Sequence, residues 1–433
     1  MKNFFLFAIA CLLVQATISQ PKQIFPTIKE SSPEAGGFSA ERLARIDKVV
    51  NEYVNNQWFN GGVALIVRNG KIVYYKAFGY DDLTTKKPMQ RDAIFRIASQ
   101  TKAITSVAVM MLYEEGKLML EDPISKYIPE FKNPKVVDKY NAADTTYTTV
   151  PAKREVTIRD LLTHTSGIGY AQIGTAQQNA IYYKAGVIGG IGVDNVVLGD
   201  KMKILGRLPL FHQPGERWTY GLNTDVLGYL VEVVSGMNLD QFFRQRIFEP
   251  LGMNDTYFYL PKEKHQRLVN LYTEDTATRK AVKMSEVFSL NGNLYRDYPN
   301  SAGTYYSGGG GLSSTVYDYA IFLQMMLNGG TYNGKRILSR NTVRMMTMNQ
   351  VGDLGMWGGY NKFGLGFGVA TERSSAMLPV NEGTFDWGGM FATTYWVDPK
   401  ENMVALFYRN IYPTSHWNFG EKYKILVYQA IND

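Results

Sequence analysis

The pair of side chains best suited to chemistry in this sequence is Ser99 and Lys102, in the stretch RIASQTKAIT. Residues i and i+3 share one face of a helix, so the hydroxyl and the amine point the same way if a helix begins here. The first turn of a helix also offers unpaired N–H groups and the positive end of the dipole, which stabilise a developing oxyanion. The pair predicts a nucleophilic serine; the alternative is a capping serine beside a solvent-exposed lysine.

Competing nucleophiles are few. Ser19 and Lys22 have the same spacing, but Pro21 lies between them at the expected end of a signal peptide. No G-x-S-x-G motif occurs, which argues against the elbow of α/β-hydrolases. The four histidines are scattered without an H-x-x-x-H pair, so no metal site is expected. A base for Ser99 must therefore be something other than histidine.

Tyr220, in QPGERWTYGLNTDVLGYL, is the candidate base because it lies at a loop tip just before an expected helix. A phenol beside an ammonium group loses its proton more readily, since the positive charge favours the phenolate. Tyrosine can then act as a general base. The alternative is a packed ring, the usual fate of the 29 tyrosines in the chain.

The elements that must position these groups can be read from local patterns. Apolar residues at helical spacing follow Ser99 as far as Gly116, so a helix begins at or just before the serine. Two β-rich runs flank Asn69-Gly70, a strong hairpin signal, and a second hairpin is expected to turn at 398–402. Ser39 can cap a helix before the first hairpin, and FGEKYKILVYQAI predicts a closing helix.

The middle of the chain reads as helix and loop. Helices are expected over Asp225–Ser235, ended by Gly236, and over Leu239–Phe248, ended by Pro250. The glycine-rich SGGGG run at 307–311 reads as a loop that matches no phosphate-binding motif. The fold class is therefore α+β: an antiparallel sheet completed by both termini, flanked by N- and C-terminal helices, with an inserted, mainly helical domain.

Composition is that of a globular protein: 433 residues, 45% hydrophobic and 20% charged. The net charge of +7 is spread along the chain without a run of five or six basic residues, so nucleic acid is not an expected partner. No cofactor is expected. The boundaries we expect are a leader over 20–37 and a catalytic domain over 38–433, with an α/β part at about 38–105 and 300–433 and a helical part at about 106–299.

The first 19 residues have the order of a signal peptide: Lys2, an apolar run and small polar residues. Their removal would take away Cys11, the single cysteine, so a mature chain would have neither thiol catalysis nor cysteine-bound metal. We expect a secreted or periplasmic protein with no integral membrane segment in the mature chain. Lipid attachment at Cys11 is the less favoured alternative, because the apolar run continues past it.

Six stretches, in order, resemble the serine β-lactamase and penicillin-binding-protein superfamily, specifically its class C-like branch with the family VIII carboxylesterases. They are SQTK, LLTHTSGI, QPGERWTYGL, VVSGMNLDQFFRQRIFEPLGMNDTYF, GGGGLSSTVYDYAIFLQMMLNGG and WGGMFATTYWVDP. They cover nearly the whole chain from Phe38 onward. The resemblance implies a β-lactamase/transpeptidase-like fold.

The resemblance also implies roles for particular residues. Ser99 would be the acylated nucleophile, Lys102 its proton-accepting or charge-tuning neighbour, and Tyr220 the general base and acid. The backbone N–H groups of Ser99 and Met390 would form the oxyanion hole. His164, within LLTHTSGI, is expected to be a structural hydrogen-bonding residue.

Two departures from the family pattern bear on the substrate. The tyrosine motif is often Y-x-N, but here Leu222 takes the third place and Asn223 follows, so Asn223 is a substrate-binding candidate in a shifted position. The third motif, K-T-G in penicillin-recognising enzymes, is Trp387, Gly388 and Gly389 here. Tryptophan cannot bind a carboxylate as lysine does and offers an aromatic wall instead. These three residues are expected to line the substrate site, and both departures favour uncharged acyl groups.

The leading hypothesis is a serine hydrolase that cleaves esters of small, largely uncharged acyl groups through an acyl-serine intermediate. One alternative is a D-stereospecific amidase, peptidase or transpeptidase, with weak β-lactamase activity as a side reaction. A second alternative is a non-catalytic binding protein on the same fold, which the presence of Ser99, Lys102 and Tyr220 argues against. The expected partner is a small-molecule ester or amide. The aromatic-rich stretch 357–367 is a candidate lining of an acyl pocket, with core packing as the alternative.

Overall fold

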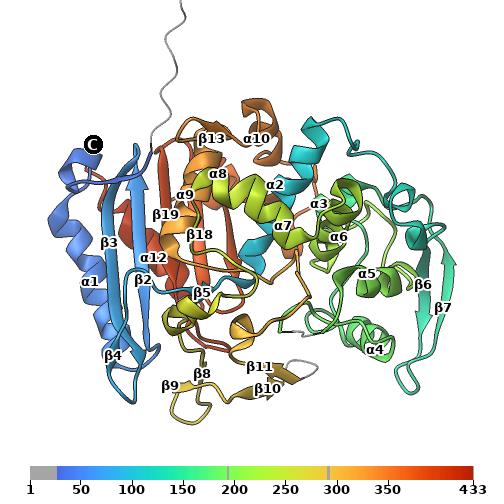
Figure 1. Cartoon of the computed structure of the whole chain (residues 1–433), viewed down its shortest axis with the longest axis horizontal. Helices are drawn as coiled ribbons and strands as arrows, with labels where there is room; N and C mark the ends of the chain where they lie inside the picture. The colour runs from blue at the N-terminus through green and yellow to red at the C-terminus, as the bar shows by residue number, and fades with distance from the viewer. Residues whose placement is uncertain (1–26, 193–194, 290–292, 433) are drawn as a thin grey trace, which may run out of the picture.

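The computed structural model describes residues 27–192, 195–289 and 293–432 (Figure 1). The expected signal peptide, Cys11 and the first part of the expected leader lie outside the described residues. Their assignments stay predictions.

One nine-stranded sheet, assembled from both ends of the chain, forms the middle layer of the α/β part. Neighbouring strands are antiparallel except β1 and β3, which are parallel, and β4 pairs with β3. The strands follow in the order β1 (Lys29–Glu30), β3 (Lys71–Asp82), β2 (Gly61–Arg68), β19 (Met403–Tyr408), β18 (Thr393–Asp398), β17 (Phe385–Gly389), β16 (Gly368–Val369) and β15 (Lys362–Phe363), with β4 at Lys87–Pro88. The predicted sheet, completed by both termini, is confirmed.

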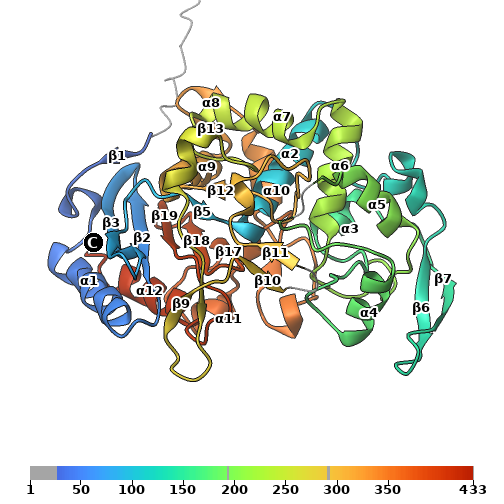
Figure 2. The same ribbon diagram turned by 60° about the horizontal axis from the view of Figure 1, so that its bottom comes forward.

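Helices cover both faces of this sheet, as Figures 1 and 2 show. On one face lie the first and last helices, α1 (Ala40–Asn55) and α12 (Phe419–Tyr428). On the other lie α2 (Thr101–Glu114) and α9 (Val316–Leu327). The period-2 pattern of β2 explains the two layers: Val63 and Leu65 belong to the core under α2 and α9, while Ala64 and Ile66 belong to the core under α1 and α12.

The local signals at the two ends of the chain were read correctly. Asn69 and Gly70 form the β2–β3 turn with φ of 55° and 73°, which fits a type I′ turn, where both central residues need positive φ. The Ser39 side chain caps α1 by accepting a hydrogen bond from the Arg42 N–H at 3.2 Å. Strands β18 and β19 form the second predicted hairpin, and α12 is the predicted closing helix.

Most of the middle of the chain packs beside α2, on the side away from α1 (Figure 1). The segment 272–283 is the exception, because its Tyr272 and Ala281 belong to the core under α1 and α12. The described residues of the middle of the chain contain α-helices and a π-helical turn, and also hairpins that the description as mainly helical did not include. The helical elements are α3 (Ile158–Leu162), α4 (Ala176–Lys184), α5 (Leu198–Gly206), α6 (Asn223–Ser235), α7 (Leu239–Phe243), η5 (Arg244–Phe248) and, continuing η5, the short α8 (Glu249–Leu251). The hairpins are β6–β7 (Lys135–Tyr140, Tyr147–Pro151), β8–β9 (Tyr272–Glu274, Ala281–Lys283) and β10–β11 (Val287–Ser289, Asn293–Tyr295).

The remaining short elements join these layers. Strands β5 (Phe95–Arg96) and β12 (Ser313–Ser314) pair with each other and bring the start of α2 next to the loop before α9. Strands β13 (Thr331–Tyr332) and β14 (Lys335–Arg336) form a hairpin that leads into α10 (Arg340–Met346), and α11 (Glu372–Ser375) precedes β17.

Two predicted helix ends differ from the structure. Helix α6 begins at Asn223, two residues earlier than expected, and ends at Gly236 as predicted. The expected stop at Pro250 is wrong: the helical path of α7 continues through η5 into α8 and ends at Gly252, which has φ of 74°. Pro250 lies in α8 directly after the π-helical turn η5, in which the Glu249 N–H bonds to the Arg244 carbonyl.

Candidate active site

Ser99 lies in a single 3-10 turn, η2 (Ala98–Gln100), that leads directly into α2. The residue before it, Ala98, has φ of 43°, a left-handed conformation that is uncommon for a residue with a Cβ. Such backbone strain is found preferentially at functional sites, where the surrounding structure enforces it. The turn therefore holds Ser99 in a position set by its neighbours rather than by local preference.

Lys102 points from the first turn of α2 toward Ser99, as its spacing predicted, but it is not a surface residue. Its side chain is buried, with 2% of the residue exposed. Its Nζ donates to the Tyr170 hydroxyl at 2.8 Å, to the Gly309 carbonyl at 2.6 Å and to the Ser99 Oγ at 3.3 Å. An ammonium group has three donors, and all three are used. The alternative of a solvent-exposed lysine is excluded.

Tyr220 meets the same serine from the loop before α6. Its hydroxyl donates to the Ser99 Oγ at 2.7 Å, and Lys102 Nζ lies 4.8 Å from the centre of its ring. The structure thus places both Lys102 and Tyr220 within direct hydrogen-bonding distance of the Ser99 Oγ. A hydroxyl between a phenol and an amine, at the start of a helix, has the arrangement needed for a nucleophile with a nearby proton acceptor.

The glycine-rich run at 307–311 fixes Lys102, a role that the sequence did not reveal. Asp225, buried in α6, accepts from the Ser307 hydroxyl at 2.6 Å and from the Gly309 N–H at 3.3 Å. A Cβ at position 309 would lie 2.3 Å from the Asp225 carboxylate, so only glycine fits. Burial raises the pKa of Asp225, while the Lys102 charge and the Ser307 hydrogen bond act in the opposite direction. This loop delivers the carbonyl that anchors the Lys102 amine.

Tyr170 is the second residue that sequence reasoning missed. Burial, followed by the influence of Tyr220 and Asp225, raises its pKa well above the usual value, so its hydroxyl stays protonated. Its ring lies 5.3 Å from that of Tyr220, between centres, and its oxygen accepts from Lys102. The residues next to Tyr170 in the sequence do not distinguish it from the other tyrosines. Its role depends on contact with Lys102, which is 68 residues away in the chain.

The WGG motif ends β17 beside the Ser99 turn. A Cβ at Gly389 would lie 2.4 Å from the Ile97 carbonyl, so the strand can approach η2 only with glycine here. Met390, the next residue, lines a cavity of about 30 Å³ together with Ser99 and Tyr170. An oxyanion hole made by the Ser99 and Met390 N–H groups requires these two residues to lie side by side, as they do here. The role of these N–H groups stays a prediction.

Aromatic rings form a wall on the other side of Tyr220. The Trp387 ring lies 5.6 Å from the Tyr220 ring and is stacked on Trp357 at 5.7 Å, with an interplanar angle of 12°. Phe363 meets the Trp387 ring edge-on at 5.4 Å, and Trp218 stacks on Tyr220 at 6.0 Å. Trp387 thus lies next to the site as expected, and the stretch 357–367 supplies two members of the wall.

Asn223 does not reach the site, so the expectation that it binds substrate is not supported. It is fully buried at the start of α6, where its Nδ2 is 2.9 Å from His164 Nδ1 and its Oδ1 accepts from the Ser166 hydroxyl. Burial and the Lys102 charge lower the pKa of His164 well below its usual value, so the ring is neutral. His164 lies 5.1 Å from the Tyr220 ring, and its predicted structural hydrogen-bonding role is confirmed.

A metal centre and a membrane-spanning helix are both absent from the described residues. No group of three or more histidine, cysteine, aspartate or glutamate side chains in this part of the chain is arranged to hold a metal ion. Within the same ranges no helix combines the length and the apolar character needed to cross a membrane.

Comparison with known proteins agrees with this geometry. The Beta-lactamase family model matches residues 46–428. Esterase EstB of Burkholderia gladioli is 30% identical over 400 residues, covering 89% of this chain and 94% of EstB. Protein Rv1367c of Mycobacterium tuberculosis is 34% identical over 370 residues (83% and 87%), and a putative D-alanyl-D-alanine carboxypeptidase of Escherichia coli is 29% identical over 421 residues (93% and 89%).

A solved structure agrees as well. EstCE1, described as a hydrolase with promiscuous acyltransferase activity, superposes with a TM-score of 0.76 at 27% identity and covers 91% of this chain and 99% of its own. The chain belongs to the Beta-lactamase family and has its α+β fold, and membership makes it a serine hydrolase by class.

Proposed function

We propose that this protein hydrolyses carboxylic esters of small, uncharged acyl groups through an acyl-Ser99 intermediate. The observation that carries the proposal is the position of the Ser99 Oγ, 2.7 Å from the Tyr220 hydroxyl and 3.3 Å from the Lys102 Nζ. The adjoining 30 Å³ cavity is small and, among the described residues, lined by no charged side chain. A short acyl group such as acetyl suits such a cavity.

The chemistry follows from this geometry. The reactive form we propose has Tyr220 as phenolate beside the Lys102 ammonium, with the hydrogen bond to Ser99 reversed so that the serine donates. The Ser99 proton then passes to the phenolate as Oγ bonds to the ester carbonyl carbon. The N–H groups of Ser99 and Met390 stabilise the oxyanion. The tetrahedral intermediate then expels the alkoxide, which takes the proton from Tyr220. Water attacks the acyl-enzyme in the same manner and gives one proton to Tyr220. Tyr220 passes this proton to the departing Ser99 Oγ as the acid is released.

Trp387 favours esters over peptides that end in a carboxylate. An aromatic ring at the third motif offers no positive charge to pair with a carboxylate, and its closest partners are the rings of Trp357, Tyr220 and Phe363. The similarity to esterase EstB supports the same choice.

Hydrolysis of D-amino-acid amides is the second candidate, because similar chains in Escherichia coli and Salmonella are named as putative D-alanyl-D-alanine carboxypeptidases. The decisive comparison is of kcat/KM for p-nitrophenyl acetate and for a D-alanine p-nitroanilide under one set of conditions. A preference for the anilide would replace the ester proposal with the amidase alternative.

The covalent step is tested with a fluorophosphonate probe. Mass spectrometry of the labelled protein is expected to find one adduct, on the peptide that contains Ser99, and Ser99→Ala is expected to abolish both labelling and ester turnover. A folded wild-type protein that takes no label would instead favour the non-catalytic binding protein.

The N-terminal 19 residues support export to the periplasm or the medium. Sequencing the N-terminus of the protein recovered from each cell fraction tests this, with cleavage after Ser19 as the expected result.

A further inference from the structure

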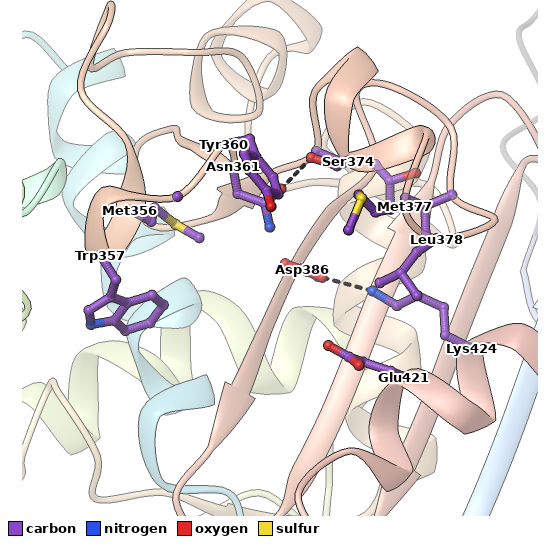
Figure 3. A pocket seen from close by; sticks show the side chains of 14 residues that line it. Met356, Trp357, Tyr360, Asn361, Ser374, Met377, Leu378, Asp386, Glu421 and Lys424 are labelled. Carbon is purple, nitrogen blue, oxygen red and sulfur yellow. Dashed lines mark hydrogen bonds and ion pairs between the residues drawn. The ribbon is translucent and has the colours of Figure 1, made fainter.

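A cavity of about 410 Å³, separate from the small one at Ser99, begins at the aromatic wall. Figure 3 shows Met356 and Trp357 on one side of it and Glu421 and Lys424 of α12 on the other, with Asp386 of β17 between them. Trp357 belongs both to this cavity and to the aromatic wall beside Tyr220, because it lines the cavity and its ring lies 5.9 Å from the Tyr220 ring. The cavity is therefore linked to the reactive groups through one side chain.

The direction of the reaction indicates which part of a substrate would reach this cavity. The acyl group must lie beside Ser99 and Met390, where about 30 Å³ is available. The leaving oxygen must lie at the Tyr220 hydroxyl, which returns the proton to it. Trp387 and Trp357 flank the Tyr220 ring at 5.6 and 5.9 Å, so an alcohol that extends beyond a few atoms meets these two rings next.

The conformation of Trp357 suggests a role in binding rather than in packing. It is 68% exposed and has φ of 48°, a left-handed conformation that is costly for a bulky residue. Two glycines follow it in the sequence, and Gly358 also has a positive φ, of 74°. An exposed ring contributes little to the hydrophobic core, yet this one is stacked over Trp387 and meets Trp218 in a T-shaped contact, with ring centres 4.7 Å apart.

The far side of the cavity carries a net negative charge. Lys424 pairs with Asp386 at 3.0 Å, which leaves the carboxylate of Glu421 without an ion pair in the part of the chain that the structure describes. Arg373 lies over the Tyr360 ring, 4.2 Å from its centre, and does not line the cavity. A cationic group is favoured here by Glu421, and the exposed Trp357 ring attracts a cation as well.

We propose that this cavity binds the distal part of the leaving alcohol, and that it selects alcohols in which a ring is followed by an ammonium group. The ring stacks on Trp357 and Trp387, and the ammonium group reaches Glu421. This assignment rests on the proposed ester hydrolysis and adds to it the class of alcohol that is removed.

The test uses three acetate esters of one phenol whose flexible linker ends in a primary amine, an acetamide or a carboxylate. The expected order of kcat/KM is amine, acetamide, carboxylate, with about a fivefold preference for the amine over the acetamide, as one partly exposed ion pair provides. Glu421→Gln is expected to remove that preference. Glu52→Gln, at an exposed position on α1, is the matched control and is expected to retain it. Trp357→Ala is expected to raise KM for all three esters about tenfold, with Trp357→Phe intermediate.

Binding of the free phenols to Ser99→Ala protein, followed by tryptophan fluorescence, separates this proposal from the proposed function. If the amine phenol binds about fivefold more tightly than the acetamide phenol, and Glu421→Gln on the same background abolishes the difference, the cavity assignment stands even if no ester is hydrolysed. Equal binding of the three phenols, or a preference that survives Glu421→Gln, overturns it.

Discussion

Tyr220 and Ser99 are 121 residues apart in the sequence, yet the Tyr220 hydroxyl donates a 2.7 Å hydrogen bond to the Ser99 Oγ. The ring that carries this hydroxyl is held between His164, Tyr170 and the tryptophans of the aromatic wall. The phenol can therefore move little, and its oxygen stays aimed at the serine. Rigid placement of this kind is what proton transfer in a transition state requires.

Removing only the Tyr220 hydroxyl separates its chemical role from its packing. Tyr220→Phe keeps the ring and its aromatic neighbours but removes the group that exchanges a proton with Ser99. We expect kcat/KM for p-nitrophenyl acetate to fall by about 100- to 10,000-fold, with little change in the thermal unfolding midpoint. The matched control is Tyr183→Phe, at a tyrosine on α4 that is 68% exposed, and full activity is expected there. Activity within about threefold of wild type in Tyr220→Phe would rule out the proposed base.

Lys102→Met tests the buried ammonium group. The change removes the donor to Ser99 and leaves the buried Gly309 carbonyl without its 2.6 Å partner, which costs about 1–3 kcal/mol of folding free energy. We expect ester turnover to fall at least about 100-fold and the free energy of unfolding in urea to decrease by that amount. Lys132→Met, at an exposed lysine, is expected to change neither quantity. A fully active, equally stable Lys102→Met protein would contradict the assignment.

Local patterns were sufficient for the outer parts of the fold and for the reactive pair. The Asn69-Gly70 turn and the Ser39 cap depend on a few neighbouring residues, so short windows of sequence predicted them. The same holds for Ser99 and Lys102, whose spacing of three places both on one helical face. The third partner, Tyr220, was identified by its position before a helix and by the family resemblance.

The rest of the site depends on contacts between distant segments. Lys102 is buried because the 307–311 loop and α6 cover the start of α2, and no pattern within α2 indicates that cover. Tyr170 and Asp225 act through partners 68 and 82 residues away in the chain. The partners of Asn223 were not predicted for the same reason, since its amide contacts His164, 59 residues earlier. Hydrophobic periodicity indicates which face of a helix or strand is apolar, but it does not indicate which polar side chains from distant segments contact one another.

Asp318, in the first turn of α9, makes stability depend on pH. Its buried carboxylate accepts from the Asp255 N–H at 2.7 Å and from the Thr256 hydroxyl at 3.0 Å, but burial dominates and raises its pKa to about 6. The folded protein therefore holds this proton more tightly than the unfolded chain does. Its contribution to stability is present at pH values below about 4 and is lost as the pH rises through about 6.

Asp318→Asn is the test of this dependence, because the amide keeps an oxygen acceptor but cannot ionise. The free energy of unfolding of wild type minus that of Asp318→Asn is expected to fall by about 2–3 kcal/mol between pH 4 and pH 7. The exposed Asp353→Asn variant should show a difference that is nearly constant over the same range. A constant difference for Asp318→Asn as well would show that this carboxylate titrates normally in the folded protein.

Adding one methyl group at either glycine of the WGG motif tests the oxyanion hole. A Cβ at Gly389 would lie 2.4 Å from the Ile97 carbonyl and 2.3 Å from the Thr393 hydroxyl, so Gly389→Ala must push the end of β17 and the Met390 N–H away from Ser99. A Cβ at Gly388 would meet its nearest neighbour, the Thr393 carbonyl, at 3.3 Å, which a small shift relieves.

We expect kcat for p-nitrophenyl acetate to fall about 100- to 1000-fold in Gly389→Ala, the effect of losing one oxyanion donor, and far less in Gly388→Ala. Fluorophosphonate labelling rates should follow the same order, since the proposed oxyanion hole would also bind the phosphoryl oxygen. Equal losses in the two variants would mean that the approach of β17 to the Ser99 turn does not support catalysis.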